Sequence, residues 1–250
     1  MGRVLCISSQ TVYGPVGNSA AVPALQAGGH EVMQIPTVVL SNHPGHGTPA
    51  GQATSAELLE DMLAALNRIN AFDKLDAVMT GYFTSAAQVV AVAKQISTLK
   101  AARESLHVLV DPVIGDHGAL YVPLDVAEAI RDHLLPLATI TTPNLFELTW
   151  LTGSEIVADA VNYLNVAETI VTSVPQGSDA LTTILYINGT NKTHIMPRHE
   201  KVPHGTGDFL AGCYLAGRLD KNVERAFEAA MAKLETVIQR SAGLPTLRFN

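Results

Sequence analysis

The residues best suited to chemistry form one short loop, Gly205-Thr206-Gly207-Asp208. The run that follows, 209–216, is almost wholly apolar and therefore predicts a buried helix that begins near Asp208. Glycines let backbone N–H groups approach a ligand closely, and the N-terminus of a helix attracts anions. These N–H groups could hold a transferring phosphoryl group while Asp208 takes the proton from an attacking hydroxyl. The alternative is an ordinary aspartate at the start of a helix, and the loop taken alone favours that interpretation.

A second group of carboxylates lies in the segment Asp111-Pro-Val-Ile-Gly-Asp116, which follows a predicted strand. Hard oxygen ligands at the end of a strand suit Mg²⁺, which would bridge the phosphates of a nucleotide. Two loop aspartates that hydrogen-bond to the backbone would explain the pattern equally well. Asp116, next to Gly115, is the stronger candidate for a metal ligand.

Asn144 and Glu147 have the spacing of a helix cap, in which each side chain bonds the backbone of the other residue. The same two residues could also serve a site. Glu147 would then lie in the water shell of a metal ion, and Asn144 would lie near phosphates. The two roles are compatible.

Apolar runs and capping residues predict that strands and helices alternate along the chain. The predicted strands cover residues 3–8, 31–39, 76–80, 107–111, 138–142 and 168–174, followed by a hairpin of 182–187 and 193–196. The other predicted helices cover residues 19–27, 54–72, 85–103, 125–134, 144–153, 158–164 and 223–239, with capping boxes at Thr54/Glu57 and Ser85/Gln88. Segments 10–19 and 43–51 are predicted loops. This alternation indicates an α/β fold with a mostly parallel sheet covered on both faces.

In such a sheet, ligands bind at the carboxyl ends of the strands. Polar residues gather at the ends of the predicted strands: Ser9, Tyr82, Asp111, Asp116, Asn144, Glu147, Thr172 and Ser173. Their coincidence predicts one shared site and argues against a purely structural protein.

The composition narrows the classes of function. The chain has 250 residues, of which 47% are hydrophobic and 16% charged, and this suits a single α/β domain over residues 1–250. The net charge is −7 and no basic run stands out, so a nucleic-acid partner is disfavoured. No apolar run is long enough to cross a membrane. Cys6 and Cys213 lie in apolar runs, as is typical of a reduced, cytoplasmic protein.

Several familiar sites are absent from the sequence. A P-loop is excluded because no G-x-x-x-x-G-K-[ST] segment occurs. G-x-G-x-x-G and G-x-S-x-G are also absent, which disfavours a Rossmann oxidoreductase and a hydrolase of the nucleophile-elbow type. His43 and His46 have no cysteine or acidic partner nearby and are interpreted as polar loop residues rather than zinc ligands.

Taken together, these motifs resemble those of the pyridoxal kinases of the ribokinase-like superfamily, and the resemblance covers most of the chain. The broad markers are Gly205-Thr-Gly-Asp208 and Asn144-x-x-Glu147. The narrower markers are Ser9-Gln-Thr-Val-Tyr13-Gly14 with Val16-Gly17-Asn18, Ser41-Asn42-His43 with Gly45 and Gly47, Thr80-Gly81-Tyr82, Asp111-Pro-Val-Ile-Gly-Asp116 and Leu120-Tyr121-Val122-Pro123.

The resemblance implies a ribokinase-like three-layer α/β/α sandwich around a mostly parallel sheet. It also implies ATP-dependent phosphorylation of the 5′-hydroxymethyl group of pyridoxal and related compounds, within vitamin B6 salvage. Asp208 would be the base and the N–H groups of residues 205–207 the anion hole. Mg²⁺ would be held by Asp116 and, through water, by Glu147. The family further implies a homodimer and the use of a monovalent cation such as K⁺.

The resemblance assigns the remaining site residues to the two substrates. Those expected near ATP are Asp111, Tyr121, Asn144, Glu147, Thr172 and Ser173. Those expected around the pyridine ring are Ser9, Val16, Leu40, His43 and Tyr82.

The chain departs from the family pattern at three places. Pro44 and His46 stand where relatives have Thr and Tyr, and the segment between Gly153 and Glu168 is short. These departures bear on the choice of substrate more than on the reaction. Two alternatives remain at this point: a hydroxymethylpyrimidine kinase on the same scaffold, and a non-catalytic protein that binds a nucleotide or pyridoxal.

Overall fold

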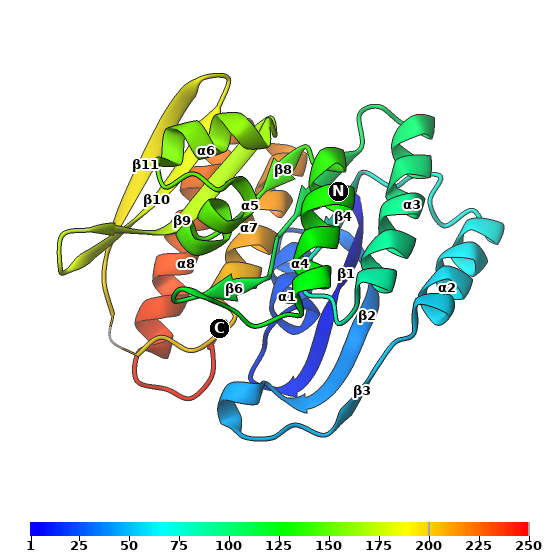
Figure 1. Ribbon diagram of the computed structural model, residues 1–250, viewed down its shortest axis with the longest axis horizontal. Helices are drawn as coiled ribbons and strands as arrows, with labels where there is room; N and C mark the ends of the chain where they lie inside the picture. Colours follow the sequence, from blue (N-terminus) through cyan, green and yellow to red (C-terminus); the bar gives the residue numbers. More distant parts are fainter. Residues whose placement is uncertain (200, 250) are drawn as a thin grey trace.

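The computed structural model describes residues 1–199 and 201–249 and is built around a large twisted sheet (Figure 1). The strands run in the order β11-β10-β9-β8-β5-β4-β1-β2-β3. Their bounds are β1 Arg3–Tyr13, β2 Glu31–Asn42, β3 Gly51–Ala53, β4 Ala77–Thr80, β5 His107–Val110, β8 Ile140–Thr141, β9 Glu168–Gln176, β10 Ala180–Ile187 and β11 Thr190–Pro197. The pairs from β2 across to β9 are parallel, whereas β3 pairs antiparallel with β2, and β10 pairs antiparallel with both β9 and β11. The predicted mostly parallel sheet is therefore confirmed.

Helices cover both faces of this sheet (Figure 1). One face carries α1 (Asn18–Ala27), α7 (Thr206–Asp220) and α8 (Val223–Ser241). The other face carries α2 (Ala56–Arg68), α3 (Ala86–Ala102) and α4 (Leu124–Ala129), and α4 continues into a π-helical turn, Ile130–Leu134, and a 3₁₀ turn, Leu135–Leu137. The short helices α5 (Leu145–Thr152) and α6 (Val157–Leu164) pack together over β9. The arrangement is the predicted three-layer α/β/α sandwich.

The alternation of side chains along the central strands explains the two cores. In β1, Val4 and Cys6 face the core under α1, α7 and α8, whereas Leu5 and Ile7 face the core under α2, α3 and α4. Successive residues of a strand point to opposite faces, so a strand buried on both sides must be apolar throughout.

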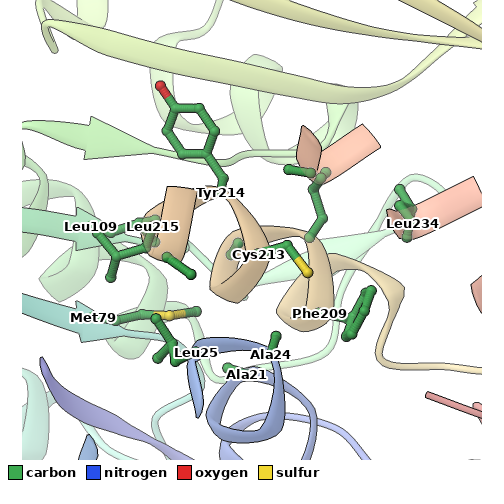
Figure 2. Close-up of a cluster of buried hydrophobic side chains, with 14 of the residues drawn as sticks. Ala21, Ala24, Leu25, Met79, Leu109, Phe209, Cys213, Tyr214, Leu215 and Leu234 are labelled. Atoms are coloured by element: carbon green, nitrogen blue, oxygen red, sulfur yellow. The ribbon is translucent and has the colours of Figure 1, made fainter. Parts of the chain in front are cut away.

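Helix α7 lies at the centre of the first core. All eight residues from Phe209 to Ala216 are buried, as the apolar run predicts. Figure 2 shows Leu215 of α7 beside Leu109 of β5, and Ala21, Ala24 and Leu25 of α1 lying against the same helix. The helix that begins at the loop of residues 205–208 is therefore anchored in the core over these eight residues.

Several predicted boundaries are wrong. β1 continues to Tyr13 through a segment predicted as a loop, and β2 continues to Asn42, beyond its predicted end at Val39, because the two strands pair with each other there. β3 was not predicted.

The predicted caps of α2 and α3 also differ from the structure. α2 is capped by Ser55, whose hydroxyl oxygen accepts from the N–H of Leu58, while the Thr54 hydroxyl donates to the carbonyl oxygen of Pro36. At α3, Ser85 accepts from the N–H of Gln88, but the amide oxygen of Gln88 accepts from Thr84, so the predicted box is only half formed.

Other local predictions are confirmed. α5 has the full capping box of Asn144 and Glu147 and ends at Gly153 in the left-handed conformation. The β10–β11 hairpin turns at Asn188 and Gly189, whose φ angles of 49° and 73° are those of a tight hairpin turn. A small separate hairpin, β6 (Gly115–Asp116) with β7 (Ala119–Leu120), follows β5. None of the described helices has the length and apolarity needed to cross a bilayer.

Candidate active site

The loop that begins α7 has a backbone conformation that only glycine suits. Gly205 caps the helix with φ 99°, and a Cβ atom on it would lie 2.1 Å from the carbonyl oxygen of Pro15. The N–H groups of Thr206, Gly207 and Asp208 belong to the first turn of α7, where no intrahelical acceptor is available. The structure thus places the predicted anion hole at the N-terminus of a buried 15-residue helix.

Asp208 lies where two helices begin. Its half-buried carboxylate is hydrogen-bonded by its own N–H group and by that of Gly17, the residue that caps α1. Burial raises the pKa of Asp208 to about 6, and the two backbone N–H groups oppose this rise. A carboxylate with a pKa close to neutral is suited to accept a proton and to release it again.

Two further carboxylates are buried at the carboxyl ends of β5 and β8. Asp111 follows β5 and accepts a hydrogen bond of 2.8 Å from the hydroxyl of Thr142. Burial raises the pKa of Asp111 to about 8, with a further contribution from the charge of Asp208. Glu147 accepts from the N–H groups of Ile114 and Asn144, yet its pKa is also raised, by burial and by Asp111. The site therefore concentrates negative charge in a poorly solvated place.

Asp116 and Tyr121 lie on or next to the β6–β7 hairpin. The Asp116 side chain is 48% exposed and accepts from the N–H of His117. Although Tyr121 is 54% exposed, the pKa of its phenol is raised by partial desolvation and then by four carboxylates, Glu147, Asp111, Asp208 and Asp116. The phenol therefore lies within electrostatic reach of all four acidic residues, and the predicted acidic residues share one site.

The acidic residues of this site suit Mg²⁺ better than a metal ion that requires all of its ligands from the protein. Within the described residues, no three His, Cys, Asp or Glu side chains form a ready-made metal group. Mg²⁺ is commonly bound through one or two carboxylates, with water and phosphate oxygens completing the shell. A partly exposed Asp116 next to a buried Glu147 fits this pattern.

Asn144 connects the N-terminus of α5 to the loop that carries Asp111 and Asp116. Its amide oxygen accepts from the N–H of Glu147 at 2.9 Å, and its amide nitrogen donates to the carbonyl oxygen of Gly115 at 2.8 Å. Asn144 also forms a bridge to Thr172, and the next residue, Ser173, has φ 59° at an irregularity in the β9–β10 pairing. Such bulges redirect the backbone next to a site. The structure thus brings the predicted ATP residues together.

The residues predicted around the pyridine ring line the ends of β1, β2 and β4. Ser9 is buried and its hydroxyl oxygen would lie 2.3 Å from a Cβ atom on Gly17, so it lies directly beside the start of α1. Tyr82 is held by its backbone, because its N–H donates to the Ser8 hydroxyl oxygen and its carbonyl accepts from Thr37. The other residues of this group are half-buried: Val16, Leu40, His43 and Tyr82.

Two surface hollows lie elsewhere. One of about 410 Å³ lies between α1, α7 and α8, and one of about 590 Å³ is lined by residues at the amino ends of β1 and β2. None of the predicted site residues lines either hollow.

Sequence reasoning missed Thr142, Ser8 and Gly17 as parts of the site. Each one holds a predicted residue in place: Thr142 bonds Asp111, Ser8 bonds the backbone of Tyr82, and the Gly17 N–H bonds Asp208. Their position at strand ends was the available signal, but hydroxyl and glycine residues are too common for that signal to select them.

Comparison with known proteins shows the family of this chain. The profile of the phosphomethylpyrimidine kinase family matches residues 14–246. The pyridoxine/pyridoxal/pyridoxamine kinase of Bordetella bronchiseptica (strain ATCC BAA-588 / NCTC 13252 / RB50) is 38% identical, over 96% of this chain and 90% of its own length. The pyridoxal kinase of Arabidopsis thaliana is 33% identical, over 96% of this chain and 82% of its own. The chain belongs to the pyridoxal kinase family.

Solved structures of pyridoxal kinases share the fold over nearly the full chain. The Leishmania donovani pyridoxal kinase in complex with ADP and pyridoxine superposes with a TM-score of 0.90 at 30% identity, covering 99% of this chain and 90% of that one. The Entamoeba histolytica pyridoxal kinase gives a TM-score of 0.92 at 26% identity, covering 100% of this chain and 93% of that one.

The departures from the pyridoxal kinase pattern have a defined structure here. Pro44 opens a 3₁₀ turn, Pro44–His46, that His43 caps through its ring nitrogen Nδ1. The short segment after Gly153 forms α6.

Proposed function

We propose that this protein transfers the γ-phosphoryl group of ATP to the 5′-hydroxymethyl group of pyridoxal, giving pyridoxal 5′-phosphate in vitamin B6 salvage. The observation that carries the proposal is Asp208, a carboxylate at the N-termini of α1 and α7 with its pKa raised towards neutral. Asp208 accepts the proton of the substrate hydroxyl as that oxygen attacks the γ-phosphorus atom, and ADP leaves on the opposite side. The N–H groups of residues 205–207 hold the oxygens of the transferred group.

The other residues position the two substrates. Ser9, Val16, Leu40, His43 and Tyr82 hold the pyridine ring beside Asp208. ATP lies along the carboxyl ends of β5, β8 and β9, next to Asp111, Tyr121, Asn144, Glu147, Thr172 and Ser173. Such positioning brings the reacting oxygen and phosphorus into line, which accounts for much of the catalysis of phosphoryl transfer.

The acidic residues support a requirement for cations. We propose that Asp116, together with Glu147 through water, holds Mg²⁺, which neutralises negative charge on the ATP phosphates. The Asp111 carboxylate and the Thr142 hydroxyl, 2.8 Å apart, are oxygen ligands of the kind that would take K⁺. Burial and neighbouring carboxylates raise the pKa values of Asp111 and Glu147. A nearby cation would therefore strongly stabilise the ionised form of these carboxylates.

The proposal extends to the chain as a whole. One sheet runs from β3 to β11, which supports a single kinase domain over residues 1–250. Exposed apolar residues on β1 and β2 support a homodimer. Both cysteines are buried and free, which supports an enzyme of the reducing cytoplasm.

A second candidate is a hydroxymethylpyrimidine kinase. The family profile that matches residues 14–246 favours it, because that profile is named for phosphomethylpyrimidine kinase. The same Asp208 and anion hole would serve either alcohol, so only the ring pocket distinguishes the two activities.

The deciding experiment measures ADP release by the purified protein with MgATP and pyridoxal, with mass spectrometry of the product. Parallel reactions omit pyridoxal or replace it with hydroxymethylpyrimidine. We expect ADP that depends on pyridoxal and a product heavier by one phosphate group. Turnover with the pyrimidine alone would favour the second candidate. Binding of pyridoxal or ATP by folded protein without any ADP would indicate a non-catalytic binding protein.

A further inference from the structure

Four side-chain rings form a row beside the start of α7. Tyr13 contacts His46 edge-on, with ring centroids 5.0 Å apart. His46 lies 6.2 Å from His43, and His43 lies 4.2 Å from His204 with an interplanar angle of 35°. We name Tyr13, His46, His43 and His204 the ring row. Its members come from three segments that are far apart in the sequence: the end of β1, the turn after β2, and the loop before α7.

The backbone approaches the ring row closely at two glycines. A Cβ atom on Gly45 would lie 2.9 Å from Nε2 of His204, and one on Gly14 would lie 2.7 Å from the ring of His46. The turn after β2 is itself compact, because the Asn42 amide nitrogen donates to the carbonyl oxygens of His43 and Gly47. The rings and the turn therefore contact one another at the surface, where Tyr13, His46 and His204 are exposed and His43 is half-buried.

The His43 ring is uncharged at neutral pH. The N–H of Gly45 donates to Nδ1 of His43 at 3.1 Å, so this nitrogen carries no proton and Nε2 does. Burial lowers the pKa of His43 to about 4, with further lowering by His204 and His46. Burial and His46 also lower the pKa of His204. Because the pKa values of His43 and His204 are both lowered, this pair can stack without charge repulsion. The three histidines do not converge on a common point as metal ligands would.

His204 immediately precedes Gly205, the cap of α7, and stacks on His43, which belongs to the group predicted around the pyridine ring. We propose that His204 is a positioning residue that holds the turn of residues 43–47 against the catalytic loop and so raises the affinity for the pyridine substrate. This inference rests on the proposed function.

The test compares His204→Ala with His204→Phe, which keeps an aromatic ring for stacking. His133→Ala is the matched control, because His133 is exposed on the π-helical turn after α4. We expect His204→Ala to raise KM for pyridoxal by about three- to tenfold, as the loss of an aromatic pair predicts. We expect kcat and KM for ATP to stay unchanged, His204→Phe to restore the wild-type KM for pyridoxal, and His133→Ala to match the wild type.

Hydrogen exchange of the peptide covering residues 43–47 gives a second readout that needs no turnover. We expect faster exchange in His204→Ala than in the wild type and in His204→Phe. Equal exchange in all three proteins would overturn the positioning role, whether or not the wild type phosphorylates pyridoxal. An active wild type whose KM for pyridoxal is the same in His204→Ala would overturn the inference and leave the proposed function intact. A fall in kcat with no rescue by Phe would instead assign the imidazole a direct part in the reaction and also contradict the inference.

Discussion

Asp208 is bonded by N–H groups of two helix starts, and asparagine can accept the same hydrogen bonds through its amide oxygen. We therefore expect Asp208→Asn to fold normally and to lose about 10²- to 10⁴-fold in kcat, the usual contribution of a positioned general base. Steady-state ADP release and thermal unfolding, measured on the same preparation, check both parts. Asp179→Asn, at an exposed position between β9 and β10, serves as the control. Turnover by Asp208→Asn near the wild-type value would refute the assignment of the base.

Asp111 makes the stability of the protein depend on pH. Its pKa rises from an ordinary 3.8 in the unfolded chain to about 8 in the folded protein. The folded state therefore binds more protons than the unfolded state across this window, and the free energy of unfolding falls as the pH rises through it. Asparagine at this position carries no charge, and its amide oxygen can still accept the hydrogen bond from the Thr142 hydroxyl. We expect Asp111→Asn to raise Tm in metal-free buffer, more at the upper end of the window than at the lower.

Thermal unfolding of the wild type and of Asp111→Asn over that pH range provides the measurement. Added Mg²⁺ and K⁺ should reduce the difference in Tm, because a cation would stabilise the ionised carboxylate that only the wild type has. A variant that is less stable than the wild type at the upper end would contradict the destabilising effect of the buried Asp111 carboxylate.

Residue types and spacing identified the acidic residues that the structure brings close together, because each of them follows a predicted strand or begins a predicted helix. The supporting residues could not be found in this way. Thr142, Ser8 and His204 matter only through the side chains they contact, and each contact joins segments that are distant in the sequence.

The start of α7 offers a sharp comparison between two glycines of one element. Gly205 has φ 99° and faces the Pro15 carbonyl oxygen, whereas Gly207 has no neighbouring atom within 4 Å of an added Cβ. Gly205→Ala should destabilise the protein by more than the roughly 1–2 kcal/mol of left-handed strain, because the clash adds to it. Gly207→Ala should stabilise by up to about 1 kcal/mol, the helix preference of alanine over glycine.

Urea unfolding of the two variants beside the wild type measures both changes in the free energy of unfolding. Opposite signs are expected. Equal effects would show that the tight approach of Pro15 to Gly205 does not constrain the loop.

At the level of elements, buried strands and capped helices were predicted and the outer parts of the sheet were not. The ends of β1 and β2 mix polar residues with exposed apolar ones, and their regular structure comes from pairing with each other, as Gln10 does with Val39. β3 has only three exposed residues at the sheet edge, Gly51–Ala53, and no apolar pattern. Apolar periodicity reports burial, so it cannot detect strands that are held only by their neighbours.

The molecule as a whole presents an apolar surface where β1 and β2 extend beyond the core. Val12 is 83% exposed, Tyr13 49% and Val39 44%. A second copy of the chain would cover these side chains in the proposed homodimer. We expect Val12→Asp to shift the protein towards the monomer, because a charge would be buried in the interface.

Size-exclusion chromatography with light scattering at several protein concentrations measures this shift. Ile69→Asp is the matched control, since Ile69 is 72% exposed at the end of α2. A wild type that stays monomeric at all concentrations would exclude the proposed dimer. Equal dissociation by both variants would place the interface elsewhere.

The β10–β11 turn at Asn188 and Gly189 divides the proposed active site between two stretches of chain. Residues 1–188 carry Gly17 and the acidic residues of the nucleotide side, while the part from 189 onward carries Asp208. Because the turn is exposed and the two strands pair along their whole length, a chain cut there could reassemble through these strands. Each half alone would lack a complete catalytic centre, so two proteins fused to the halves would switch on phosphorylation only when they meet. The geometry that builds the site thus also makes the chain suitable as a split reporter of protein association.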